Sequence, residues 1–133
     1  MSWQAYVDSS LVGSGHIQKA AIVSAAGDST WAATPGFTFN PEELKTIVEI
    51  LKGDGKGPAV DKAFADGIYL GGERYVATRI EDRSIYCRQG KTGICVAKTK
   101  QAILIAQHGE HVQAGNATQT VEALADYLIK SGY

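Results

Sequence analysis

Five short strand-like runs follow one another between residues 68 and 106, and they limit the possible folds more than any other feature. The runs are rich in apolar and β-branched residues: Ile68–Leu70, Tyr75–Ile80, Ser84–Arg88, Ile94–Ala97 and Ala102–Ala106. The connections between them are too short to contain the helix of a parallel crossover. Gly71-Gly72 is also a typical hairpin turn. The segment therefore predicts an antiparallel meander.

Two further runs near the N-terminus predict another hairpin. Ala20–Ser24 has the composition of a buried strand, and Thr30–Ala32 can return beside it after a turn at Ala26-Gly27-Asp28. A helix is expected before this hairpin, over Trp3–Val12, with Ser2 as its N-cap. Helical spacing places three apolar residues of this helix on one stripe: Trp3, Val7 and Leu11.

Two more helices are predicted from capping signals. Asn40 can cap a helix that has Pro41 at its first position and ends near Lys52. Asn116 resembles a second cap, and the helix after it is expected to reach Lys130. Four apolar residues form the inner stripe of that last helix: Val121, Leu124, Ala125 and Leu128.

The glycine- and lysine-rich stretch from Gly53 to Lys62 is predicted to be a loop, followed by a helical turn over Ala63–Asp66. The resulting order is helix, strands, helix, strands, helix. Short turns between strands make this an α+β arrangement around a central antiparallel sheet. With 133 residues, the chain is expected to form one domain, residues 1–133.

Composition excludes several classes of protein. The formal net charge of −1 argues against bulk nucleic-acid binding. No apolar run approaches the roughly 20 residues of a membrane span, and the N-terminus lacks signal-peptide features, so a cytosolic protein is expected. In that compartment Cys87 and Cys95, eight residues apart, are expected to be packed thiols rather than a disulfide.

Nothing in the sequence indicates an enzyme, a cofactor or a metal site. The three histidines, His16, His108 and His111, have no cysteine or acid that completes a ligand set. The glycine-rich stretch Gly53–Gly57 lacks the spacing of a phosphate-binding loop and is read as a flexible loop. No nucleophile motif is present. The sequence therefore gives no positive reason to expect an enzyme.

Four segments carry a resemblance to a known family, and they are Ser2–Asp8, Asp28–Ala32, Asp82–Tyr86 and Leu124–Leu128. In order, spacing and total length the chain resembles the profilins, most closely the short ones of fungi and amoeboid protists. The resemblance implies N- and C-terminal helices packed together on one face of the sheet, with a further helix on the other face. It also implies a cytoplasmic, cytoskeleton-associated protein that binds actin monomers, proline-rich proteins such as formins, and phosphoinositides.

The resemblance places a polyproline site on aromatic residues from both ends of the chain. The matching positions are Trp3, Tyr6, Trp31, Tyr127, Leu128 and Tyr133. A polyproline II helix is already rigid, and flat rings supply grooves for its pyrrolidines. Indole N–H and phenol O–H groups can donate to its carbonyl groups. Core filling is the alternative interpretation of the same aromatic residues.

Residues 74–100 contain seven cations and two anions, a local net charge of +5 in a chain of net charge −1. Such a patch suits an acidic protein surface or phosphoinositide head groups, although a solvated strand face is the plainer alternative. The resemblance implies actin contacts at Arg74, Val76, Thr78, Arg79, Arg88, Lys91, Thr118, Gln119 and Glu122. The implied phosphoinositide contacts are Arg79, Arg83, Arg88, Lys91 and Lys98.

One rival function remains open at this point. A small-ligand sensor or an enzyme accessory domain can be built on a similar sheet-and-helix scaffold, because folds host unrelated functions. Such a protein needs an internal pocket of about 300 Å³ or more.

Overall fold

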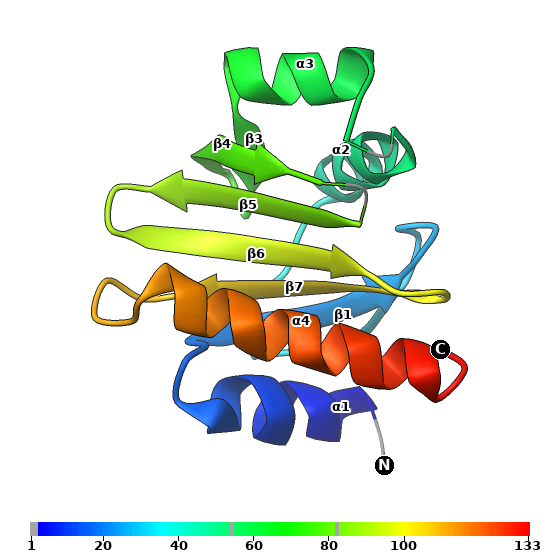
Figure 1. Ribbon diagram of the computed structural model, residues 1–133, viewed down its shortest axis with the longest axis vertical. Helices are drawn as coiled ribbons and strands as arrows, with labels where there is room; N and C mark the ends of the chain where they lie inside the picture. Colours follow the sequence, from blue (N-terminus) through cyan, green and yellow to red (C-terminus); the bar gives the residue numbers. More distant parts are fainter. Residues whose placement is uncertain (1–2, 54, 82) are drawn as a thin grey trace.

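The computed structural model describes residues 3–53, 55–81 and 83–133, and it contains a seven-stranded antiparallel sheet flanked by helices (Figure 1). The strands are β1 (Lys19–Ser24), β2 (Thr30–Ala33), β3 (Ile68–Leu70), β4 (Glu73–Ile80), β5 (Ser84–Gln89), β6 (Thr92–Lys98) and β7 (Ala102–His108). Their order across the sheet is β2-β1-β7-β6-β5-β4-β3, and every neighbouring pair is antiparallel. The predicted α+β class and the antiparallel meander are confirmed.

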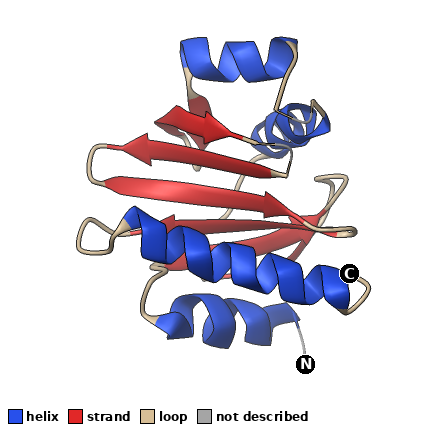
Figure 2. Cartoon of the chain, viewed as in Figure 1, coloured by secondary structure: helices blue, strands red, loops and turns tan. Residues whose placement is uncertain are grey.

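The helices form two layers on opposite faces of this sheet (Figure 2). The N-terminal helix is α1 (Trp3–Ala5), which continues as a π-helix η1 (Tyr6–Leu11) and a 3₁₀ turn η2 (Val12–Ser14). It lies beside α4 (Ala114–Lys130) on one face, as predicted (Figure 1). The other face is covered by α2 (Pro41–Lys52) and α3 (Pro58–Asp66), whose buried residues form a hydrophobic core separate from the one under α4.

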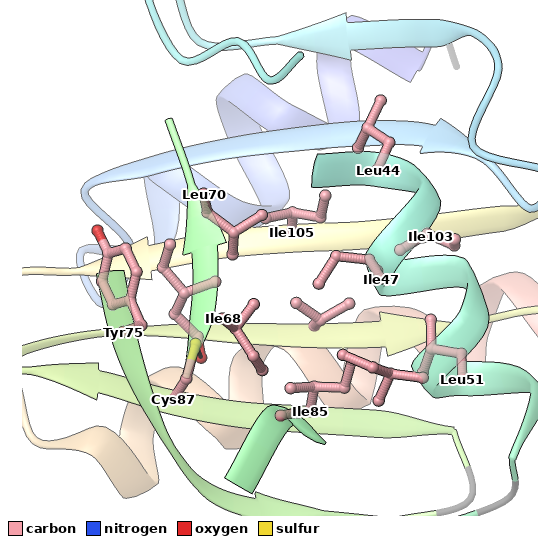
Figure 3. Packing of buried hydrophobic residues seen from close by; sticks show 14 of the residues in the cluster. Leu44, Ile47, Leu51, Ile68, Leu70, Tyr75, Ile85, Cys87, Ile103 and Ile105 are labelled. Atoms are coloured by element: carbon pink, nitrogen blue, oxygen red, sulfur yellow. Dashed lines mark hydrogen bonds between the residues drawn. The ribbon is translucent and has the colours of Figure 1, made fainter. Parts of the chain in front are cut away.

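Each helical layer buries its own apolar stripe against the sheet. On the α1–α4 face, Val7 and Leu11 are fully buried with Val121 and Leu128. On the opposite face, Figure 3 shows Leu44, Ile47 and Leu51 of α2 over the sheet. Beneath them lie Ile85 of β5 and Ile103 and Ile105 of β7. Because β7 is buried on both faces, its sequence from Ala102 to Ala106 is a continuous apolar run rather than an alternating one.

The start of α2 follows the predicted capping box. The Asn40 side chain accepts a hydrogen bond of 2.8 Å from the Glu43 backbone N–H, and the Glu43 carboxylate accepts one of 3.0 Å from the Asn40 N–H. The second Glu43 oxygen accepts from the Gly72 N–H at 2.9 Å. Gly71 and Gly72 both have positive φ, as a tight hairpin between β3 and β4 requires. Glu43 therefore ties α2 to that hairpin.

Two predictions about helix starts were wrong. Residues 58–62, assigned to a loop, form the first part of α3, because Pro58 occupies the first position that suits proline. Asn116 does not cap α4, since that helix already begins at Ala114 and its N-cap is Gln113, whose side chain makes no cap hydrogen bond. Ser2, predicted as the first N-cap, and Asp82 of the predicted bend lie outside the described residues.

The two cysteines are unpaired and buried, as expected. In the β5–β6 register Cys87 faces Ile94 and Cys95 faces Tyr86, and the two thiols belong to the cores on opposite faces of the sheet. Burial raises the pKa of the Cys87 thiol to about 12. A thiol held in its protonated form is a poor nucleophile. Among residues 3–53, 55–81 and 83–133, no helix has the length and apolar character to cross a membrane.

Candidate ligand-binding surfaces

Aromatic residues from both ends of the chain meet on the α1–α4 face. The Trp3 ring centroid lies 4.8 Å from that of Trp31 on β2 and 5.4 Å from that of Tyr133. Tyr6 extends the group, with its ring 5.8 Å from Trp3 and 6.2 Å from Tyr127 on α4. These separations lie in the range in which aromatic pairs attract one another. We call these five residues the aromatic cluster.

The aromatic cluster is open to solvent. Tyr127 is 54% exposed, Tyr133 43% and Trp31 36%, while Trp3 and Tyr6 are half-buried between them. Core filling therefore does not explain these rings. The prediction of Leu128 as a surface contact was wrong, because its side chain is fully buried under α4 with the rest of that helix's apolar stripe. Leu128 supports the cluster from beneath.

Local backbone structure places Trp31 and Tyr133 at the outer side of the aromatic cluster. Val23 pairs with Thr30 and Ile22 with Ala32, so Trp31 is the extra residue of a β-bulge, a device that re-aims a side chain. At the other end of the chain, the Tyr133 carbonyl oxygen accepts hydrogen bonds from the Gln101 N–H and, at 2.9 Å, from the Thr99 hydroxyl. The C-terminal end of the chain is therefore docked against the loop between β6 and β7.

The Tyr6 phenol remains a hydrogen-bond donor at neutral pH. Desolvation raises the pKa of Tyr6 above its ordinary value, and the hydrogen bond with Tyr127 raises it further. A protonated phenol offers an O–H group to a carbonyl oxygen of a ligand.

A second exposed surface covers strands β4 and β5, beside the first half of α4. Val76, 50% exposed, pairs with Arg88 across these strands. Their neighbours Tyr75 and Cys87 point into the core on the α2–α3 face, so Val76 and Arg88 face the α4 side. A register shift at Thr78 bends β4, and the Thr78 hydroxyl donates to the Tyr86 carbonyl oxygen at 3.0 Å. We call this surface the β4–β5 face.

Helix α4 contributes three predicted actin contacts to the edge of the β4–β5 face. The Thr118 hydroxyl lies 3.4 Å from the Cys95 sulfur, and Gln119 is exposed. The Glu122 carboxylate accepts hydrogen bonds from the hydroxyl groups of Tyr86 and Ser84 and pairs with Arg83. Glu122 therefore fixes α4 to β5, a role that the sequence did not predict because the two segments are more than 30 residues apart.

Not every predicted cation is available to an outside ligand. Arg83 pairs with Glu122 and, at 2.9 Å, with Asp126. This placement argues against Arg83 as a phosphoinositide contact. Arg79 bonds Glu81 at 2.8 Å and lies over the Tyr86 ring at 4.7 Å, and Arg74 donates to the Asp66 carbonyl oxygen at 2.8 Å. Arg88 and Lys91 are exposed, and Lys98 is half-buried at the end of β6.

A surface groove of about 1010 Å³ lies on the other side of the molecule, between α2, α3 and β3. Its walls carry exposed charged side chains, among them Glu42, Lys45 and Lys62, and the exposed ring of Tyr69. It is therefore not the internal apolar pocket that a small-ligand sensor requires. Within the part of the chain that the structure describes, no group of three or more histidine, cysteine or acidic side chains could hold a metal ion.

Comparison with known proteins identifies the family. The profilin family model matches residues 1–133. Profilin of Schizosaccharomyces pombe is 47% identical over the full length of both chains. A crystal structure of that profilin superimposes with a TM-score of 0.91 over 99% of this chain and 100% of the other, at 45% identity.

Two other solved structures extend the likeness. Profilin IA of Acanthamoeba castellanii has a TM-score of 0.90 and 40% identity, covering 99% of this chain and 100% of its own. Mouse profilin IIa, in complex with a double repeat from the FH1 domain of mDia1, has a TM-score of 0.80 and 28% identity over the whole of both chains. Sequence, fold and full-length coverage agree, and the chain belongs to the profilin family.

Proposed function

We propose that this chain is a cytoplasmic actin-monomer-binding protein that regulates actin polymerisation and holds proline-rich ligands on a separate surface. The observation that carries the proposal is the aromatic cluster, in which rings from both ends of the chain form one solvent-open group. The function is one of binding, without covalent chemistry.

The aromatic cluster suits a polyproline II ligand. Such a helix has no internal hydrogen bonds, and little conformational entropy is lost when it binds. Its pyrrolidine rings can pack between Trp3, Trp31 and Tyr133, and the phenols of Tyr6 and Tyr127 can donate to its carbonyl oxygens. Mouse profilin IIa, a relative of this chain, has been solved in complex with a double repeat from an FH1 domain, which supports the assignment of this kind of ligand. We assign proline-rich segments, such as those of formins, to this site.

The β4–β5 face and the first half of α4 are assigned to actin. The assigned contacts on this face are Val76, Thr78, Arg79, Arg88, Lys91, Thr118, Gln119 and Glu122, and Arg74 is assigned at its edge, where it bonds the end of α3. Arg88 and Lys91 give this face a positive charge that suits an acidic partner. The face lies toward the β4 side of the sheet, whereas Trp31 lies on β2 at the opposite edge. One molecule can therefore hold actin and a proline-rich segment together.

Phosphoinositides are assigned to Arg88 and Lys91 of this face, with Arg79 at its margin, and to Lys98 at the far end of β6. Each well-placed cation near an anionic membrane is worth about 1 kcal/mol. Because this set shares Arg88 and Lys91 with the actin contacts, lipid and actin should compete for one surface.

A polymerisation assay tests the proposal. Labelled actin monomers are polymerised with increasing amounts of the protein, alone or with a proline-rich peptide present. The proposal predicts slower spontaneous nucleation in proportion to protein added, and retention of that effect with the peptide bound. Unchanged actin kinetics at a large excess of protein would contradict the actin assignment, while a saturating change in tryptophan fluorescence with peptide reports the other surface separately.

A further inference from the structure

We infer that Gln4 is a positioning residue of the aromatic cluster: its side-chain amide fastens α1 to the edge strand β2 and thereby sets the contact between Trp3 and Trp31. The inference rests on the proline-rich ligand site proposed above. A polar side chain outside the aromatic cluster thus aligns the rings of that site.

The Gln4 amide makes two hydrogen bonds to one residue of β2. Its Nε2 donates to the Ala33 carbonyl oxygen at 3.1 Å, and its Oε1 accepts from the Ala33 N–H at 3.3 Å. β2 is the edge strand of the sheet on this side. Ala32 and Thr34 direct their backbone groups toward β1, so the N–H and C=O groups of Ala33, between them, point outward. The amide therefore satisfies the outward backbone groups of Ala33 as a further strand would.

A third contact orients the amide itself. The other Nε2 hydrogen of Gln4 points to the Asp8 carboxylate, with an Nε2–Oδ1 distance of 3.1 Å. Asp8 lies one helical turn further along the N-terminal helix. This contact fixes which end of the amide is the donor, and the donor is the end that the Ala33 carbonyl oxygen needs.

Because of its position in the chain, this link can set how the rings of Trp3 and Trp31 lie relative to each other. Trp3 directly precedes Gln4, and Trp31 lies two residues before Ala33. The two rings lie 4.8 Å apart between centroids. The shortest connection between them runs from Trp3 to Gln4, through the Gln4 amide to Ala33, and back along β2 to Trp31. Because Trp31 is the unpaired residue of a β-bulge, the β1–β2 ladder alone does not fix its orientation toward α1.

Two variants test the inference, with Gln18→Met as the control for loss of an exposed glutamine just before β1. Gln4→Met keeps the length of the side chain and removes all three hydrogen bonds. Gln4→Glu keeps an acceptor for the Ala33 N–H but places a carboxylate against the Ala33 carbonyl oxygen and Asp8. The titratable groups in the contacts of this site are Asp8, which bonds the Gln4 amide, and the phenols of Tyr6, Tyr127 and Tyr133 in the aromatic cluster, and β2 itself carries none.

Binding of a polyproline peptide is measured by tryptophan fluorescence, at neutral pH and near pH 4.5. Gln4→Met should weaken binding about three- to tenfold at both values, the loss expected from two or three exposed hydrogen bonds. Gln4→Glu should weaken peptide binding as much at neutral pH. Its affinity should recover toward the wild-type value near pH 4.5. The recovery is expected because Asp8 raises the pKa of the introduced carboxyl, and the protonated acid again donates to the Ala33 carbonyl oxygen.

Circular dichroism gives a readout that needs no ligand. Two indoles in contact couple and produce paired bands, which should shrink in Gln4→Met and persist in Gln18→Met. Wild-type affinity and unchanged bands in Gln4→Met would overturn the inference. If the wild type bound no peptide, the proposed ligand would be wrong, while the paired bands would still decide whether Gln4 aligns the two rings.

Discussion

The Glu122 carboxylate on α4 accepts a hydrogen bond of 2.8 Å from the Tyr86 hydroxyl on β5. The same carboxylate accepts from Ser84, which is almost fully buried, and pairs with Arg83. Two donors from β5 and a third from the residue before it therefore converge on a single helical side chain. Desolvation and the hydrogen bond to Glu122 raise the pKa of the Tyr86 phenol, which keeps its proton in this arrangement.

Replacing Glu122 by glutamine should destabilise the fold. The amide has the same shape but offers one acceptor oxygen and no charge to Arg83, so one of the three donors loses its partner. The expected loss is about 1–3 kcal/mol in the free energy of unfolding, measured by urea denaturation. Asp126→Asn is the control, because Asp126 meets the same Arg83 but is 70% exposed, and it should cost much less. Equal losses in the two variants would contradict this role of Glu122.

The two asparagines once predicted as helix caps should behave differently. Asn40→Ala removes the side chain that accepts from the Glu43 N–H, and it should cost about 0.5–2 kcal/mol of stability. Asn116→Ala should change stability little, because Asn116 lies inside α4 and its backbone makes the bonds: the N–H donates to the Gln113 carbonyl oxygen and the carbonyl oxygen accepts from the Thr120 hydroxyl. Thermal unfolding of both variants under one condition makes the comparison, and a larger loss from Asn116→Ala would show that the cap assignment is wrong.

The buried thiol of Cys87 should make stability fall at alkaline pH. Its pKa is about 12 in the folded protein against a reference of 9.0. The unfolded chain therefore loses this proton first, and the stabilising contribution is fully present below pH 9 and is lost as the pH rises toward 12. Urea denaturation at pH 8 and pH 10 should show that the free energy of unfolding declines less in Cys87→Ala than in the wild type. Identical declines would contradict the proposed effect of burial.

Charge reversal at Arg88 should weaken actin binding and leave polyproline binding intact. Arg88 is exposed on the β4–β5 face, so a glutamate there repels an acidic partner without disturbing the core. Lys45→Glu provides the matched control, because Lys45 is an exposed lysine on α2, away from that face. Co-sedimentation with actin measures the effect, and normal actin affinity in Arg88→Glu would remove this residue from the contacts.

Periodicity and turn chemistry predicted most of the fold. The strand runs were readable because β-branched residues stand between glycine-containing turns, as at Gly71-Gly72. α3 was missed in part because glycines and lysines before Pro58 resemble a loop, although proline at a first helical position was a signal. The true start of α4 carries no capping side chain, so only packing of Ala117 against the sheet reveals that turn.

The candidate sites were less predictable than the fold. The rings of the aromatic cluster were recognised from family motifs, but the same motif included Leu128, whose place on the apolar stripe already predicted burial. The pairing of Arg83 with Glu122, and of Gln4 with Ala33, depends on segments far apart in the sequence. Local patterns carry no information about which polar side chains meet across such distances.

The most direct test of the two-surface account is Trp3→Ala, assayed in parallel with a polyproline peptide and with actin monomers. Trp3 contacts three other rings of the aromatic cluster, so its loss should weaken peptide binding more than about tenfold. Actin affinity should stay within a factor of two of the wild-type value, provided that circular dichroism shows a folded variant. An equal loss of both activities in a folded protein, or peptide binding at full strength, would contradict the account.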